Sequence, residues 1–338
     1  MAVSKRVGRA LWAVVVLGGL AGVLAALGWG LMTGMERAAN ELPAVAAETT
    51  EGDGLSAFAL ARWTGSESAR ARLLGEAVDA AATDWRVLAL IEKGHPVDLP
   101  LSTGEVRRRL HVLAGDNAYV HLARMETIVH CCRHHDEIRG GCCASDLAEA
   151  AAAGEAATHY ESPGPALRRS LVRRFDQVPA RRFGWVLPET AKSAAVELNL
   201  SLMTMSISLA PLSELDEACA DAHPGTRIAC SHLAWLVIRD SDSMFDQEHA
   251  TELLAAVGTP AQRAAAAERE RELAWLRWNR RQIGETISFG DQDEAYAAAD
   301  TLEGMTSLAA ARTLLQSRGV ALLPPKGWVE PTTAPPED

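Results

Sequence analysis

An uncharged stretch from Ala10 to Met32 constrains this chain more than any other feature of its sequence. As a helix rising about 1.5 Å per residue, this stretch would be roughly 34 Å long, which exceeds the roughly 30 Å hydrocarbon core of a bilayer. Only a helix satisfies its own backbone in lipid. Trp12 and Trp29 lie near its ends, where indole rings favour the membrane interface. The sequence therefore predicts a single transmembrane helix over residues 10–32, with the lipid bilayer as its partner.

Charges on the two sides of this stretch predict its orientation. Lys5, Arg6 and Arg9 precede it, whereas mostly acidic residues follow it: Glu36, Glu41, Glu48, Glu51 and Asp53. The basic side of a membrane helix stays in the cytoplasm. We expect residues 1–9 in the cytoplasm of a bacterium, a signal-anchor in the inner membrane and the remaining chain in the periplasm.

A cleaved signal peptide is the alternative, because Ala44-Val45-Ala46 has the small-x-small pattern of a cleavage site. The apolar run is longer than the usual apolar region of a signal peptide, and this site lies far beyond its end. Either reading exports the rest of the chain.

Small residues recur every fourth position within the stretch and share one helix face: Gly18, Gly22, Ala26 and Gly30. Such a face lets two membrane helices approach closely. It predicts a homodimer formed through the transmembrane helix, although glycine and alanine are also simply abundant here.

The chain has 338 residues, with 33 lysines and arginines against 44 aspartates and glutamates. Removing the three N-terminal bases makes the exported part still more acidic, which argues against nucleic acid as a partner because phosphate binding needs a basic face. Aromatic residues make up only 5% of the chain, and long stretches are rich in alanine, leucine and arginine. This composition favours helices over sheets.

Helical periodicity and helix-breaking residues divide the exported part into four regions. We expect an all-α fold with an acidic linker at 33–54, a repeat-like helical region at 55–187, a second helical region at 188–322 and a disordered, proline-rich tail at 323–338. Ser66, Ser243 and Thr259 are predicted N-caps, the last followed by Pro260 at the first helical position.

A weak internal echo lies at an offset of 32 residues. Ala82-Thr83-Asp84-Trp85 precedes one apolar helical pattern, and Ala114-Gly115-Asp116-Asn117 precedes another. Over about residues 55–160, this succession of helix, short turn and helix resembles tetratricopeptide-type repeats. The resemblance implies an array of helical hairpins with a curved, protein-binding surface. Most of the signature residues of that repeat are missing.

Histidines and cysteines are densest between His130 and Cys143, and this segment has two interpretations. An even number of cysteines in an exported chain indicates disulfides, here two pairs among Cys131, Cys132, Cys142 and Cys143. Alternatively, His130 and His134 share a helix face and could bind zinc or copper with Cys131 and Cys143. The spacing matches no standard metal site, so we expect neither a metal nor another cofactor.

Cys219 and Cys230 are placed almost symmetrically about Pro224 and Gly225, where two flanking helices should meet. Residues equidistant from the bend of a helical hairpin lie opposite each other. The sequence therefore predicts a Cys219–Cys230 disulfide.

A basic run extends from Arg168 to Arg182 and alternates with Leu167, Leu171 and Phe175. We expect the apolar residues to face a core and the arginines to face solvent, where they could also meet lipid head groups or an acidic partner.

These features predict a membrane-anchored periplasmic α-helical protein that binds or scaffolds other envelope proteins. The sequence contains none of the common nucleophile, phosphate-binding or zinc-protease motifs. Two alternatives remain: an enzyme whose site is assembled from dispersed residues, and a metal-handling module built on residues 130–143.

Overall fold

The computed structural model describes residues 41–48, 52–94, 101–134, 142–178, 212, 215–286 and 308–331. Within these ranges the regular structure is helical, as the composition predicted, with one isolated bridge between Asn117 and His159. None of the helices in these ranges combines the length and apolar character needed to cross a bilayer. The predicted membrane helix, with Gly18, Gly22, Ala26 and Gly30, lies outside the described residues.

The chain divides into two compact units. The first contains residues up to Ala80 together with residues 166–206, and the second contains the other residues from Ala81 to Asp338. Each unit is described by itself.

Among the described residues, the helices of the first unit are a segment at residues 41–48, α2 (Gly54–Ala61), α3 (Glu67–Ala80) and most of α8 (Gly164–Asp176). Leu42, Phe58, Leu73 and Phe175 are fully or almost fully buried. Ser66 Oγ accepts a hydrogen bond from Ala69 N at 3.3 Å, which confirms the predicted cap of α3. The helix at 41–48 corrects the expectation of a flexible linker over those residues: Leu42, Ala46 and Ala47 are buried there.

Asp53 ties α8 to the start of α2. Its carboxylate accepts from Ser56 N at 3.2 Å as the N-cap of α2, from Arg173 Nη2 at 2.8 Å and from the Ser170 hydroxyl. Burial alone would raise the pKa of Asp53, but hydrogen bonds from Ser170, Ser56 and Arg173 hold it below its ordinary value. Asp53 is therefore part of the folded unit and does not belong to a flexible linker.

Arg174 corrects the expectation that this arginine faces solvent. Its side chain is fully buried, with Nη2 3.5 Å from Glu76 Oε2 and Nη1 3.4 Å from Ser56 Oγ. A Cβ at Gly52 would lie 2.8 Å from the guanidinium, so the chain passes directly against it. The basic run alternates as predicted at Arg173, which is exposed, but one of its arginines lies in the core.

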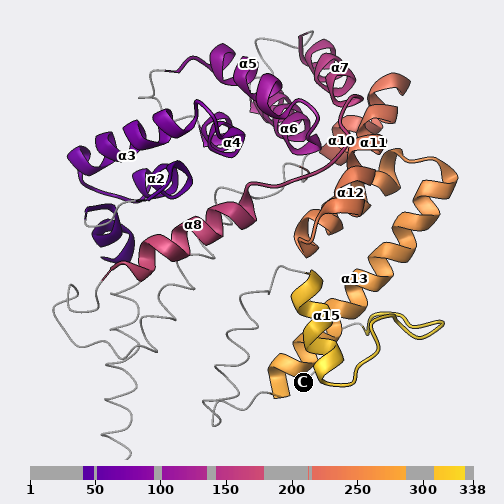
Figure 1. Cartoon of the computed structure of the whole chain (residues 1–338). Coiled ribbons are helices and arrows are strands. Elements are labelled where there is room, and N and C mark those ends of the chain that lie inside the picture. Colours follow the sequence, from indigo (N-terminus) through magenta and orange to yellow (C-terminus); the bar gives the residue numbers. More distant parts are fainter. Residues whose placement is uncertain are drawn as a thin grey trace, which may run out of the picture. The chain divides into compact units, whose positions relative to one another are not determined.

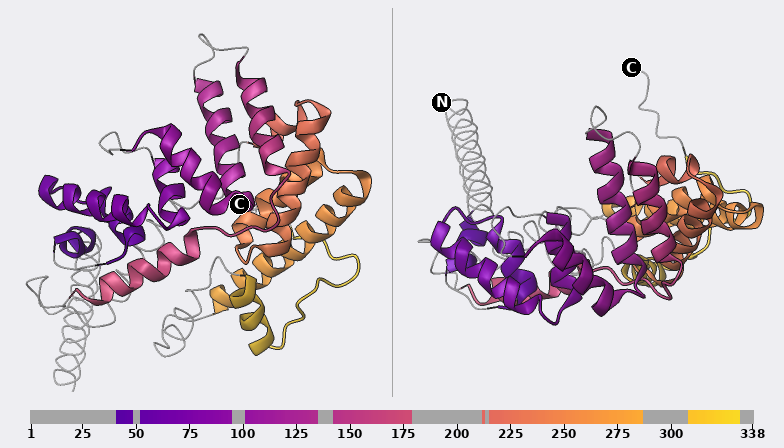
Figure 2. Two further views of the ribbon diagram at one scale, coloured as in Figure 1. Left: turned by 45° about the horizontal axis from the view of Figure 1, so that its top comes forward. Right: turned by 90° about the horizontal axis from the view of Figure 1, so that it is seen from above.

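The second unit contains the remaining helices, and most of them pack against their neighbours in sequence (Figures 1 and 2). Figure 2 shows α6 and α7 side by side. The bounds are α4 (Trp85–Gly94), α5 (Thr103–Ala114), α6 (Ala118–His134), α7 (Cys142–Gly154), α10 (Leu215–Ala220), α11 (Pro224–Asp240), α12 (Met244–Val257), α13 (Pro260–Thr286) and α15 (Leu308–Ser317).

The two turns of the predicted internal echo begin α4 and α6. Asp84 Oδ1 accepts from Arg86 N at 2.9 Å, and Asn117 Oδ1 accepts from Tyr119 N at 3.0 Å. The equivalent side chains are thus 33 residues apart, one more than the offset in the sequence. Trp85 and Tyr119, the residues that follow these turns, have ring centroids 6.3 Å apart. Membership of the repeat class remains a prediction.

The loop between α11 and α12 caps the first turns of two helices, α12 and α15. Ser243 caps α12 by accepting from Asp246 N at 3.2 Å, as predicted. Asp242 accepts from Leu308 N through its main chain at 2.7 Å and from Ala309 N through Oδ1 at 2.9 Å, so it caps α15 from a distant place in the sequence. These bonds to main-chain N–H groups account for the acidic residues of the loop.

The segment after α15 corrects the prediction of a disordered tail, at least as far as Pro331. Gly319 has a φ of 68°, and Val320 N donates to Leu315 O at 2.9 Å, the pattern of a Schellman motif that reverses the chain. Val320 and Leu322 then pack against buried residues of α12, α13 and α15. Within the predicted tail itself, which begins at Leu323, Pro324 is buried and the ring of Trp328 lies against those of Trp275 and Trp278. The expectation of disorder missed these contacts because they depend on a helix far away in the sequence.

Candidate functional site

A surface groove on α5 is the first candidate site. Ser102 begins this helix by accepting from Glu105 N at 3.2 Å. Val106 and Leu110 face the core, so the rest of the helix turns toward solvent. A groove of about 300 Å³ opens on this outer side, lined by Ala82, Glu105, Arg108, Arg109, Val112 and Leu113.

The groove combines exposed apolar side chains with a basic rim, by which we mean Glu105, Arg108 and Arg109. Val112 is 77% exposed and Leu113 is 40% exposed. Glu105 accepts from Arg109 Nε at 2.7 Å and also from Arg108. The hydrogen bonds from these two guanidinium groups lower the pKa of Glu105, and the bond from Arg109 has the larger effect. One carboxylate facing two arginines leaves the rim positive, so the groove suits a segment that presents apolar and acidic side chains.

A buried polar cluster in the second unit is the other candidate, and Tyr160 is at its centre. We call Tyr119, Tyr160 and Asp246 the Tyr160 junction. Tyr160 Oη donates to Asp246 Oδ2 at 2.8 Å, and Ser241 Oγ donates to the same oxygen at 3.1 Å. The rings of Tyr119 and Tyr160 lie 6.2 Å apart. The junction therefore joins α6, the segment before α8 and the first turn of α12.

Main-chain bonds hold Tyr160 in place from both sides. Tyr160 N donates to Asp240 Oδ2 at 2.9 Å. Asn117 donates through Nδ2 to Glu161 O and accepts from Glu161 N through Oδ1, both at 3.0 Å. The segment 158–161 thus runs beside residues 116–118 as a short extended crossing, which explains the isolated bridge between Asn117 and His159.

Burial controls the protonation of the junction. It raises the pKa of Asp246, an effect that hydrogen bonds from Tyr160 and Ser241 partly offset. It also raises the pKa of Tyr160, with the negative charge of Asp246 as the next cause. The hydroxyl of Tyr119 is buried, has no hydrogen-bond partner among the described residues, and its pKa is raised by burial and then by Glu126.

Lys93 supplies positive charge near this cluster. Its Nζ lies 3.7 Å from Glu126 Oε2, and burial lowers its pKa although Glu126 and then Asp246 act in the opposite direction. The buried Glu92 pairs with Arg107 Nε at 2.9 Å. Tyr160 and Ser241 already donate hydrogen bonds to the Asp246 carboxyl group. The cluster therefore acts chiefly as a structural crosslink between helices.

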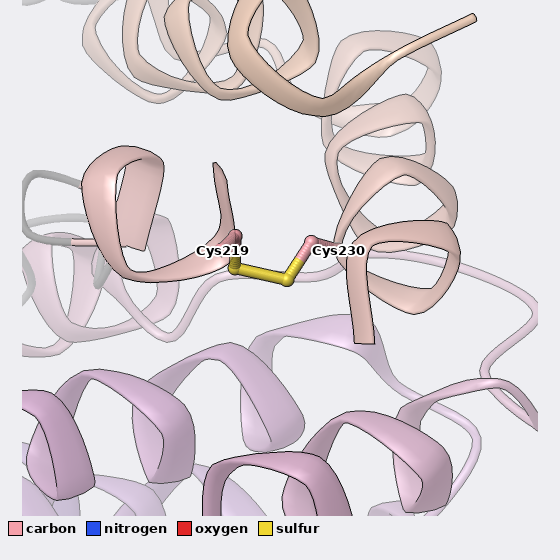
Figure 3. Close-up of a disulfide and its surroundings, with 2 residues drawn as sticks. All are labelled: Cys219 and Cys230. Atoms are coloured by element: carbon pink, nitrogen blue, oxygen red, sulfur yellow. A yellow bond between two sulfur atoms is a disulfide. The ribbon is translucent and has the colours of Figure 1, made fainter. Parts of the chain in front are cut away.

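Cys219 and Cys230 are joined in a disulfide, as the sequence predicted (Figure 3). Their Cα atoms are 6.4 Å apart and both side chains are fully buried. The bend lies slightly earlier than predicted, because Pro224 is the first residue of α11 and His223 caps it by accepting from Gly225 N. Proline suits the first helical position, since its missing N–H would be unpaired there anyway.

The predicted His130–Cys143 cluster is only partly described. His130 and Cys131 are exposed near the end of α6, Cys131 is a free thiol, and Cys132 is disulfide-bonded. A free Cys131 differs from the two predicted pairs. The side chains of His134, Cys142 and Cys143 lie outside what the structure describes. Among the described residues, no three His, Cys, Asp or Glu side chains are grouped as metal ligands.

Sequence reasoning missed both candidate sites. Val112 carries a weak signal, since it falls outside the apolar stripe of Val106 and Leu110, whereas Leu113 falls within that stripe and carries none. Tyr160 and Asp246 carry none, because 86 residues separate them. Neither the family models, the curated proteins nor the solved structures contain a match to this chain.

Proposed function

We propose that this chain is a membrane-anchored periplasmic helical protein that binds another envelope protein through the groove on α5. The observation that carries the proposal is the pair of exposed apolar residues, Val112 and Leu113, in the same groove as a rim on which Arg108 and Arg109 face one glutamate. Exposed apolar surface rimmed by polar groups is typical of interaction sites. The partner surface would carry apolar and acidic side chains.

Two further features support the location. The uncharged stretch at 10–32 follows three basic residues, which favours a helix with its N-terminus in the cytoplasm. A buried disulfide suits an oxidising compartment such as the periplasm. An anchor at 10–32, including its small-residue face, would hold the binding helices near the membrane and near a second copy of the chain.

Fusions test the location directly. A phosphatase that requires export should be active when joined after Asp53, and a reporter that requires the cytosol should be inactive there. The reverse pattern would refute the orientation and remove the reason to expect disulfides.

Crosslinking in living cells tests the groove. A photo-crosslinking residue at Val112 should yield a covalent complex with another envelope protein, and one at the exposed Ala265 of α13 should not. Reversing the rim with R108E/R109E should abolish the complex, whereas R271E, a matched reversal of an exposed arginine on α13, should leave it intact. Equal capture from Val112 and Ala265, or none from Val112, would contradict a binding role for this groove.

A metal-handling role is the weaker alternative and has its own measurement. Elemental analysis of the purified chain should find no stoichiometric zinc or copper if residues 130–143 serve only as a disulfide-linked loop. Metal that is bound in proportion to protein and lost in H130A would favour the alternative.

A further inference from the structure

The C-terminal segment at residues 319–331, which we call the strap, leaves α15 and returns beside α13 (Figure 1). Its course is set by Gly319, which reverses the chain, and by Val320 and Leu322, which pack against the core. Between these two residues, Ala321 O accepts a hydrogen bond from Trp275 Nε1 at 2.8 Å. A side chain of α13 thus recognises the main chain of the strap.

Three tryptophans meet where the strap crosses α13. Trp275 and Trp278 stack with centroids 5.9 Å apart. Trp328 of the strap lies edge-on to both, with its centroid 5.1 Å from that of Trp275 and 6.4 Å from that of Trp278. The α13 tryptophans therefore form a face, the Trp275–Trp278 face, that the strap covers with one ring.

A tight turn presents that ring. Trp328 N donates to Pro325 O at 3.0 Å, and Gly327 has a φ of 79°, the geometry of a type II turn with glycine at its third position. Pro324, just before the turn, is buried. The strap is thus an extended proline-containing segment that ends in a positioned aromatic residue.

This arrangement contains the elements with which proteins recognise proline-rich segments in trans. Such recognition uses an aromatic face and the low conformational entropy of the proline-containing strand, and here an indole N–H also reaches a ligand carbonyl. Much of the strap is open to solvent: Ala321, Leu323, Pro325, Lys326 and Gly327 are exposed. To leave the face, the strap would have to release Val320, Leu322, Pro324 and Trp328 and the bond from Trp275 Nε1, all of which a second strap could restore.

We propose that the Trp275–Trp278 face is a peptide-binding groove, filled in cis by the strap and able to take the strap of a second copy of this chain in its place. A second copy is the occupant because its strap carries the same carbonyl, proline and tryptophan in the same spacing. The exchange links two copies through their C-terminal segments, on a face separate from the α5 groove.

A labelled peptide tests the proposal in the full-length chain. A fluorescent peptide of residues 319–331 should bind saturably to the L322A/W328A chain, whose own strap lacks two of its contacts. It should bind the wild-type chain at least about tenfold more weakly, because the cis strap competes at an effective concentration on the order of millimolar. A peptide with Trp328→Ala should not bind either chain. Absence of peptide binding by a folded L322A/W328A chain, or equal affinity for both chains, would overturn the proposal.

A second measurement applies even if that double variant fails to fold. A photo-crosslinking residue at the exposed Lys326 in the otherwise wild-type chain should join two differently tagged copies in membranes. Peptide mapping should locate the crosslink on α13 of the other copy, and W328A should reduce its yield severalfold. Crosslinks confined to a single copy would refute exchange.

Discussion

Two segments of the second unit dock through an aromatic ring on helices far away in the sequence, and they do so in different ways. Tyr160 is 4% exposed, its hydroxyl is bonded to Asp246, and Asn117 and Asp240 pair with the adjacent main chain. Trp328 is half-buried and meets Trp275 and Trp278 only through its ring.

The difference shows what makes an internal docking permanent. Releasing Tyr160 would leave a buried carboxylate and several main-chain groups without partners, and each such group is unfavourable in a low-dielectric interior. Releasing Trp328 would mainly uncover ring surface. The Tyr160 junction should therefore behave as a crosslink, and the strap as an element that can open.

The largest expected effect is that of Y160A. Removing a buried aromatic ring typically costs about 3–5 kcal/mol, and Asp246 would also lose its phenol donor. Urea unfolding followed by far-ultraviolet circular dichroism measures the change. The comparison would fail if W328A destabilised the chain as much as Y160A does.

The disulfide between α10 and α11 provides a covalent reference within the same unit. Replacing Cys219 and Cys230 together by alanine should lower the free energy of unfolding by about 3 kcal/mol, the entropy of closing a loop of this length in the unfolded chain. C131A is the control, since that thiol is exposed and free; it should change stability by less than about 0.5 kcal/mol. An effect of C131A equal to that of the double variant would show that the loss of stability does not come from the disulfide.

Loss of the strap contact should have a smaller effect. W328A removes two edge-on ring contacts, each worth about 0.5–1.5 kcal/mol, so we expect a loss of about 1–3 kcal/mol. W328F should recover part of it. Tryptophan emission should shift to longer wavelength in W328A as Trp275 and Trp278 gain access to water. An unchanged spectrum would indicate that the strap does not cover these rings.

Local signals were enough to predict much of this fold. Serine, threonine and proline at Ser66, Ser243 and Thr259-Pro260 marked helix starts, because a cap acts within three residues. The Cys219–Cys230 pair followed from a bend only a few residues away. The all-α fold class likewise followed from the composition alone, without knowledge of how the helices pack.

Contacts between residues far apart in the sequence required information that no local pattern carries. Arg174 reads as one more member of a basic face, yet Glu76 and Ser56 lie opposite it and pair with its charge in the core. Trp328 follows two prolines and a glycine and reads as part of a disordered tail, yet its place is set by two tryptophans about fifty residues earlier. In both cases the partner, rather than the residue, decides the structure.

The smallest expected effect concerns the slope of stability with pH, and it depends on how Asp246 is buried. Burial raises the pKa of Asp246 in the folded chain above its ordinary value of 3.8. As the pH rises above about 4, the unfolded chain releases this proton first while the folded chain still holds it. Folded Asp246 then binds more protons than unfolded Asp246, so its contribution to stability decreases with rising pH until the folded pKa is passed.

D246N removes this titration and keeps a side-chain oxygen that can accept from Tyr160. The stability of the wild-type chain minus that of D246N, measured by urea unfolding between pH 4 and 8, should therefore fall with pH. A difference that rises with pH would mean that the folded chain favours ionised Asp246 despite its burial, and the bond from Tyr160 would then be a charge-assisted hydrogen bond in place of a neutral one.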